Sequence, residues 1–112
     1  MKTMIRLCKA ADVTEGEPVA VNRDGLPALA VYCFENRYFA TDNTCTHGNA
    51  FLTDGYQDGM IIECPFHGGA FDIGSGAPTA FPCQIALKTY KVVLDDGWIA
   101  IEVPDQGGMV EQ

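Results

Sequence analysis

Short runs of apolar and β-branched residues recur along the chain, and glycine, aspartate or asparagine separates them. No stretch keeps the 3.6-residue period of an amphipathic helix. Runs of this length indicate β-strands, and their regular spacing is typical of a sandwich or a barrel. The pattern predicts strands at residues 5–9, 19–22, 28–34, 38–41, 60–63, 70–72, 90–94 and 98–102.

Turn and loop signals lie between these runs. Asp24-Gly25 and Asp96-Gly97 predict two-residue hairpin turns, because both central residues of such a turn need a positive φ. Residues 35–37 (Glu-Asn-Arg) give a weaker third turn signal. The stretches 43–50, 65–69 and 74–82 lack the strand pattern and are predicted to be loops. The glycine-rich, acidic tail after residue 103 is predicted to fray.

The size and charge of the chain exclude some classes of protein. Its 112 residues fit one domain, predicted to span 1–112. The net charge of −8 argues against a nucleic-acid partner and suits docking to a positively charged protein. No apolar run has the length of a signal peptide or a membrane span, so we expect a cytoplasmic protein without a membrane partner. Five cysteines cannot all pair in disulfides, and cysteine beside histidine in a reducing compartment points to metal.

Both histidines of the chain lie close to a cysteine. Cys45-Thr46-His47 and Cys64-Pro65-Phe66-His67 form a C-x-H and a C-x-x-H motif, with sixteen residues between His47 and Cys64. A Rieske [2Fe–2S] centre needs two cysteines on one iron and two histidines on the other. The spacing therefore predicts one such cluster, with Cys45 and Cys64 on the inner iron and His47 and His67 on the outer iron.

Two other interpretations of these four residues stay open at this stage. Two cysteines and two histidines also make a tetrahedral zinc site, although structural zinc sites more often place a cysteine pair before a histidine pair. The other interpretation is two buried cysteines with incidental histidines. Iron content and colour distinguish the cluster from both alternatives.

Residues 43–48 (Asn-Thr-Cys-Thr-His-Gly) and 63–72 (Glu-Cys-Pro-Phe-His-Gly-Gly-Ala-Phe-Asp), followed by Gly76 and Pro82, resemble Rieske proteins. Within that family, the length and the Cys-Thr-His-Gly loop resemble the ferredoxin components of bacterial multicomponent aromatic ring-hydroxylating dioxygenases. The resemblance covers roughly residues 4–103. It implies an all-β Rieske fold, with an antiparallel β-sandwich base and a small two-loop cluster-binding subdomain at about 43–72.

The resemblance also implies a role. Such a ferredoxin is a one-electron carrier and not an enzyme. It takes electrons from an NADH-dependent flavoprotein reductase and passes them to the Rieske cluster of a terminal oxygenase. Three other functions remain as alternatives: a Rieske-like small subunit of an assimilatory nitrite reductase, a zinc-stabilised interaction module, and a redox sensor.

Some neighbouring residues have predicted structural roles. Cys8 and Cys33 are predicted core or half-buried residues, and Cys83 is expected to pack against the cluster loops without being a ligand. The resemblance further implies a low reduction potential. High-potential relatives carry a cysteine at the place of Phe66, a serine at Gly69 and a tyrosine at Phe71.

Overall fold

The computed structural model describes residues 2–46, 50–65, 68–81 and 83–104. Its elements, in chain order, are β1 (Lys2–Lys9), η1 (Ala10–Asp12), β2 (Val19–Val21), β3 (Leu29–Phe34), β4 (Arg37–Asp42), η2 (Leu52–Asp54), β5 (Tyr56–Asp58), β6 (Ile61–Glu63), β7 (Ala70–Asp72), β8 (Pro78–Ala80), β9 (Thr89–Tyr90), β10 (Val92–Asp95) and β11 (Trp98–Pro104). The all-β prediction is confirmed. Over these residues no helix is long and apolar enough to cross a membrane.

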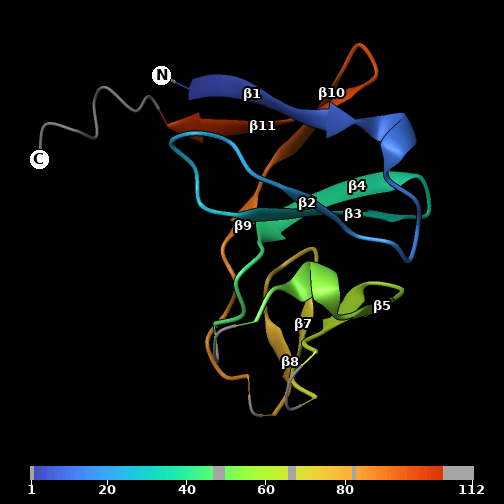
Figure 1. Cartoon of the computed structure of the whole chain (residues 1–112), viewed down its shortest axis with the longest axis vertical. Helices are drawn as coiled ribbons and strands as arrows, with labels where there is room; N and C mark the ends of the chain where they lie inside the picture. The colour runs from blue at the N-terminus through green and yellow to red at the C-terminus, as the bar shows by residue number, and fades with distance from the viewer. Residues whose placement is uncertain (1, 47–49, 66–67, 82, 105–112) are drawn as a thin grey trace, which may run out of the picture.

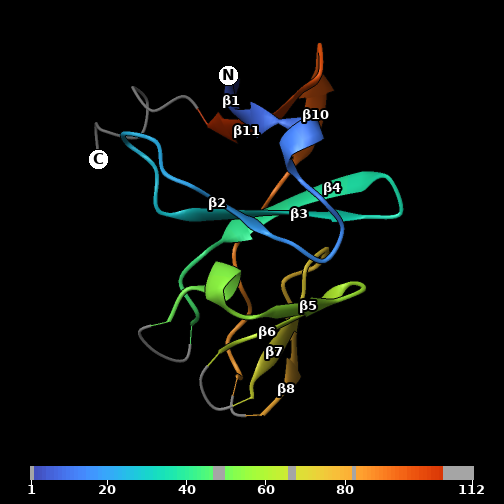
Figure 2. The same ribbon diagram turned by 45° about the vertical axis from the view of Figure 1, so that its right-hand side comes forward.

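Three antiparallel sheets are stacked along the long axis of the molecule (Figure 1). The first sheet has the order β1-β11-β10 and the second has the order β2-β3-β4-β9. These two sheets form the sandwich that we call the base. The third sheet, β5-β6-β7-β8, lies at the opposite end from the N-terminus, and both views in Figures 1 and 2 show it below β3 and β4. We call residues 43–88 the cluster end.

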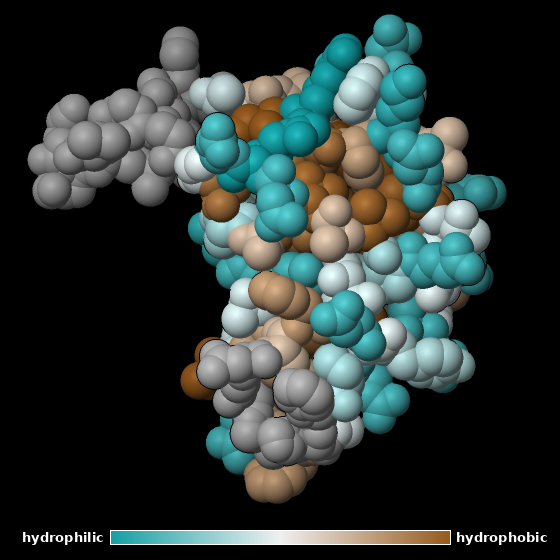
Figure 3. All heavy atoms as spheres, in the orientation of Figure 1, coloured by the Kyte–Doolittle hydropathy of each residue, from teal (hydrophilic) through white to brown (hydrophobic). Residues whose placement is uncertain are grey.

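Strand β3 separates two hydrophobic cores, because successive side chains of a strand point to opposite faces. Leu29, Val31 and Cys33 pack into the core of the base, whereas Ala30 and Tyr32 pack into the core of the cluster end. All five side chains are buried. This double burial explains why the sequence of β3 is continuously apolar and does not alternate. Figure 3 shows further apolar side chains among the polar ones at the surface of the base.

Two of the three predicted turns are tight hairpins. Asp96 and Gly97 both have positive φ and join β10 to β11, with Asp95 paired to Trp98. Glu35 and Asn36 also both have positive φ, and Phe34 pairs with Arg37 across them. The weaker turn signal at residues 35–37 thus marks a complete two-residue hairpin.

The prediction of a two-residue hairpin at Asp24-Gly25 is wrong. β2 ends at Val21 and β3 begins at Leu29, and of the two turn residues only Gly25 has a positive φ. The side chain of Arg23 explains the longer connection, because its Nη2 donates to the carbonyl of Leu7 at 2.7 Å. This bond holds the connection between β2 and β3 against β1, so that the chain does not turn directly from β2 into β3.

The strands differ from the prediction in three further places. The run at 90–94 is two strands, since β9 pairs with β4 and β10 pairs with β11, so the chain changes sheet at Lys91. β5 and β8 were not predicted. β8 lies within the predicted loop at 74–82, where two prolines and small residues hide a three-residue edge strand that pairs with β7.

Candidate metal centre

Cys45 and Cys64 occupy equivalent places on two loops at the far end of the molecule. The backbone N–H of Cys45 donates to the carbonyl of Ala50 at 2.9 Å, and that of Cys64 donates to the carbonyl of Gly69 at 2.7 Å. Each cysteine therefore begins a short loop that is closed by its own backbone hydrogen bond. The two residues are only 3% and 5% exposed, as expected for cysteines that lie behind the tip.

Asn43 anchors the first of these loops. Its side-chain Oδ1 accepts a hydrogen bond from the backbone N–H of Thr53 at 2.9 Å, and its Nδ2 donates to Thr53 Oγ1 at 3.0 Å. Its carbonyl accepts from the N–H of Leu52 at 2.8 Å. Asn43 is 3% exposed, so these bonds satisfy a buried amide that would otherwise destabilise the fold. The sequence indicated this residue only as part of a motif, without a structural role.

Residues 81–88, which we call the third loop, contact both cysteine loops. Thr46 Oγ1 donates to the carbonyl of Ile85 at 2.7 Å. The sulfur of Cys83 lies against the backbone of Gly69, so close that a Cβ built on Gly69 would be 2.3 Å from Cys83 Sγ. Only a glycine at position 69 permits this approach. The third loop thus joins the first two into one unit, and Cys83 packs against them as predicted.

Cys83 is a protonated thiol at neutral pH. Burial raises the pKa of Cys83 to about 12, and the neighbouring thiols of Cys45 and Cys64 shift it in the same direction. The Sγ atoms of Cys83 and Cys45 are 3.9 Å apart. Three of the five cysteines of the chain therefore meet in one small core.

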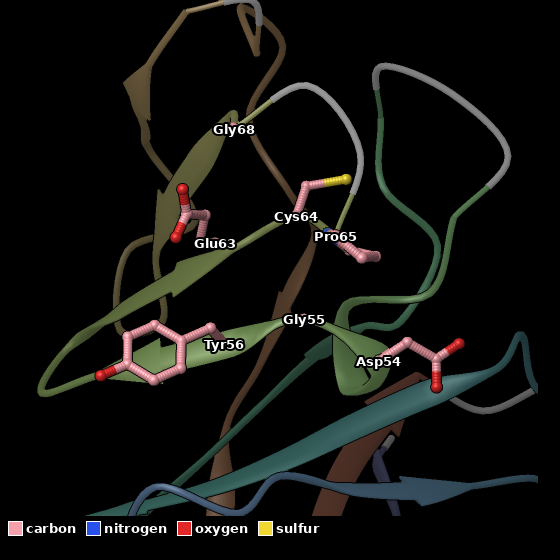
Figure 4. A pocket seen from close by; sticks show the side chains of 7 residues that line it. All are labelled: Asp54, Gly55, Tyr56, Glu63, Cys64, Pro65 and Gly68. Atoms are coloured by element: carbon pink, nitrogen blue, oxygen red, sulfur yellow. The ribbon is translucent and has the colours of Figure 1, made fainter.

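A cavity of about 420 Å³ reaches Cys64 from the side of β5. Its lining residues come from the end of η2, the start of β5, the end of β6 and the second cysteine loop; they are Asp54, Gly55, Tyr56, Glu63, Cys64, Pro65 and Gly68. Figure 4 shows the Cys64 side chain on one wall, between Glu63 and Pro65, with Tyr56 on the opposite side. Tyr56 is 65% exposed, whereas Cys64 is only 5% exposed, so the cavity opens to solvent on the tyrosine side and the cysteine stays shielded.

Two aspartates in or next to the cluster end, Asp72 and Asp42, form local hydrogen bonds. Asp72 Oδ1 accepts hydrogen bonds from the backbone N–H groups of Gly74 and Ser75, at 2.8 and 2.9 Å, which is typical turn chemistry. Asp42 Oδ1 accepts from the hydroxyl of Tyr90 at 2.6 Å. Burial of the ring, together with this carboxylate, raises the pKa of Tyr90.

The cysteine half of the predicted ligand set fits a Rieske centre. Two buried thiols lie on matched loops, and thiolate is the ligand that iron–sulfur clusters prefer. His47 and His67 lie outside the described residues, and within the described ranges no group of three or more His, Cys, Asp or Glu residues has the arrangement of a metal site. The full set of four ligands therefore stays a prediction.

Two exposed apolar side chains on the third loop were not singled out in the sequence. Phe81 is 78% exposed and Ile85 is 67% exposed. They flank Cys83 on a segment that touches both cysteine loops. The sequence contains no periodic signal for them, because the third loop has neither strand nor helix geometry between β8 and β9.

Comparison with known proteins assigns the family. Residues 3–91 match the family model of the Rieske [2Fe–2S] domain. The ferredoxin component of the p-cumate 2,3-dioxygenase system of Pseudomonas putida is 42% identical over 101 residues, which cover 89% of this chain and 86% of that protein. The solved ferredoxin of Sphingomonas yanoikuyae B1 is 63% identical, with a TM-score of 0.89, covering 91% of this chain and all of that one.

A further match comes from a solved complex of reduced oxygenase and oxidised ferredoxin in carbazole 1,9a-dioxygenase. It is 42% identical, with a TM-score of 0.83, covering 88% of this chain and 91% of that chain. Nitrite reductase small subunits match at 21% identity or less, which shows the shared fold alone. The chain belongs to the Rieske [2Fe–2S] family, among the ferredoxin components of aromatic dioxygenase systems, which are electron carriers and not catalytic enzymes.

Proposed function

We propose that this ferredoxin holds one Rieske-type [2Fe–2S] cluster through Cys45, His47, Cys64 and His67. We propose further that it works in the cytoplasm, taking single electrons from an NADH-dependent flavoprotein reductase and passing them to the terminal oxygenase of an aromatic ring-hydroxylating dioxygenase. The observation that carries the proposal is the pair of buried thiols on matched, hydrogen-bonded loops at one end of a Rieske fold.

The chain's own residues bind and shield the redox group. Cys45 and Cys64 supply thiolates from positions almost without solvent contact, and Asn43 and the third loop hold their loops in place. When bound, the cluster accepts and releases one electron at a time. No side chain needs to move a proton or form a covalent bond with a substrate, so the aromatic substrate class is set by the oxygenase and not by this chain.

The exposed side chains of Phe81 and Ile85 support a docking role for the cluster end. Large apolar residues left in solvent beside a functional site are typical of protein contact surfaces. The net charge of −8 adds long-range attraction to a positively charged partner, which salt screens over a Debye length of about 8–10 Å. We propose that the oxygenase binds this apolar rim, while the charges of the chain mainly accelerate the encounter.

Metal analysis of the purified protein tests the cofactor. We expect a red-brown protein with two irons and two labile sulfides per chain, and a Rieske-type EPR signal after reduction. His67→Cys should lose the cluster or lower its potential, because a thiolate makes the cluster one charge more negative than an imidazole does. A colourless protein with one zinc after anaerobic expression with iron would refute the proposal.

Reconstitution with purified partners tests the role. The protein, reduced by NADH and a flavoprotein reductase, should transfer one electron per chain to an isolated aromatic-ring oxygenase. A matched control is the apoprotein, which should transfer none. Stable copurification with a nitrite reductase, together with failure to reduce any oxygenase, would favour a fixed subunit over a shuttle.

A further inference from the structure

A third buried cysteine lies beside the two proposed ligand cysteines without belonging to either ligand loop. Cys83 is 5% exposed, and its backbone N–H donates to the carbonyl of Ala80 at 3.1 Å, which fixes it in the turn after β8. Its Sγ lies 3.9 Å from Cys45 Sγ, within hydrogen-bonding distance for two sulfur atoms. Neither the family assignment nor the proposed ligand set gives this residue a role.

The sulfur of Cys83 is held in place from two sides. The backbone of Gly69 lies against it, and a side chain at that position would overlap the thiol, with its Cβ 2.3 Å from Sγ. Cys45 lies within reach of the same atom. Cys83 thus bridges the second cysteine loop and the ligand of the first loop, and its thiol has little freedom to turn elsewhere.

The identity of the donor follows from the chemistry of the ligand. In the free protein either sulfur of the Cys45–Cys83 pair can donate. A cysteine that binds iron is a thiolate and has no proton to give. Once Cys45 is a ligand, the proton between the two sulfurs can come only from Cys83.

We propose that Cys83 donates an S–H···S hydrogen bond to the ligand sulfur of Cys45 and thereby raises the reduction potential of the bound cluster. A donor at a ligand sulfur stabilises the reduced cluster more than the oxidised one, because the reduced form is more negative. Cys83 is a positioning residue in this proposal and does not bind iron. The inference rests on the proposed role of Cys45 as a ligand.

Two substitutions at Cys83 separate donation from packing. Cys83→Ala removes the donor, Cys83→Ser keeps one, and Cys33→Ala removes a buried thiol of the base as a control. Iron and sulfide content first verifies an intact cluster, and protein-film voltammetry then gives the midpoint potential. We expect Cys83→Ala to lower the potential, Cys83→Ser to restore most of the difference, and Cys33→Ala to leave the wild-type value.

The infrared S–H stretching band gives a second readout, with the cluster end of the measured protein unchanged. In a Cys8→Ala/Cys33→Ala variant of the holoprotein, the remaining S–H band belongs to Cys83, because Cys45 and Cys64 are deprotonated ligands. A band at lower frequency than that of Cys33 in a Cys8→Ala/Cys83→Ala variant supports donation, and a band at the same frequency refutes it.

Three further outcomes are decisive. An unchanged potential in Cys83→Ala, or an equal shift in the alanine and serine variants, would overturn the inference and leave the proposed function standing. A Cys45→Ala variant that keeps its cluster would instead refute the ligand assignment, and with it the premise of the inference.

Discussion

The base and the cluster end of this ferredoxin build their buried cores from different kinds of elements. The base is built from long hydrogen-bonded ladders, such as β1 with β11, and its core consists mostly of valine, leucine and isoleucine from those strands. The strands of the third sheet are only three residues long. The core of the cluster end includes three cysteines, together with Leu52 of η2 and Leu87 of the third loop.

This difference indicates which region depends on a cofactor. The ladders of the base, such as β1 with β11 and β3 with β4, form most of its backbone hydrogen bonds from strand to strand. At the cluster end, single hydrogen bonds from Asn43, Thr46 and the loop-closing amides do much of the same work. A group bound between the cysteine loops would add the stability that short strands do not supply, since a ligand of the folded state favours that state.

The largest expected effect comes from removing one proposed ligand. Cys64→Ala should abolish iron binding and visible absorption completely, whereas Cys33→Ala, at a buried cysteine of the base, should keep the full cluster. Hydrogen exchange on the Cys64→Ala protein should show lost protection at residues 56–80 and retained protection in β3, β4 and β11. Loss of protection in both regions at once would show that the base does not fold independently of the cluster.

Two leucines of equal burial give the second comparison. Leu29 lies in the core of the base and Leu52 in that of the cluster end, and both are 0% exposed. Truncation to alanine at each should reduce the free energy of unfolding by about 2–5 kcal/mol. Leu52→Ala should also shorten the lifetime of the cluster in the presence of a chelator, and Leu29→Ala should not. Urea denaturation and the decay of visible absorption measure the two effects, and equal cluster lifetimes would contradict the division into two regions.

The same contrast explains how much could be predicted from the sequence. β1 and β11 are long runs that pair along one extended ladder, so their strands were predicted within a few residues. β5 and β8 have only three residues each. Their strand conformation depends on pairing with neighbouring strands, and a local sequence pattern does not show that pairing. The turn at Asp24-Gly25 was misjudged because Arg23 binds a carbonyl of β1, far away in sequence.

The candidate site was predictable where chemistry determines residue type. Cysteine and histidine at ligand spacing identified the cluster family, and the burial of Cys45 and Cys64 agrees with that reading. The packing of Cys83 against the cluster loops was predicted, but its close approach to Gly69 in particular was not, because it depends on the approach of two loops fourteen positions apart in the chain. A serine at position 69, as in high-potential relatives, would place its Cβ against the sulfur of Cys83.

Glycines of the two regions should respond differently to alanine. Gly69→Ala places a Cβ 2.3 Å from Cys83 Sγ, so we expect it to reduce the free energy of unfolding by about 1–3 kcal/mol. In a Cys83→Ala background the cost should fall, because the nearest remaining atoms are 3.3 Å away. Gly25→Ala meets no atom within 4 Å but has a φ of +82°, so its cost of about 1–2 kcal/mol should not depend on Cys83. A double-mutant cycle measured by urea denaturation checks this, and a Gly69 cost independent of Cys83 would contradict the contact.

The smallest expected effect concerns docking, and it compares one exposed apolar residue from each region. Ile85 on the third loop is 67% exposed, and Leu94 on β10 of the base is 56% exposed. If the oxygenase binds the rim of the cluster end, Ile85→Ser should lower the second-order rate constant of electron transfer by up to about fivefold, the range of an ordinary interface residue. Leu94→Ser should leave the rate constant unchanged, because Leu94 lies in the base.

Stopped-flow oxidation of the reduced protein by isolated oxygenase measures both rate constants. Raising the salt concentration should slow both variants alike, through screening of their common charge. Equal rate constants for the two variants at every salt concentration would place the contact away from the third loop.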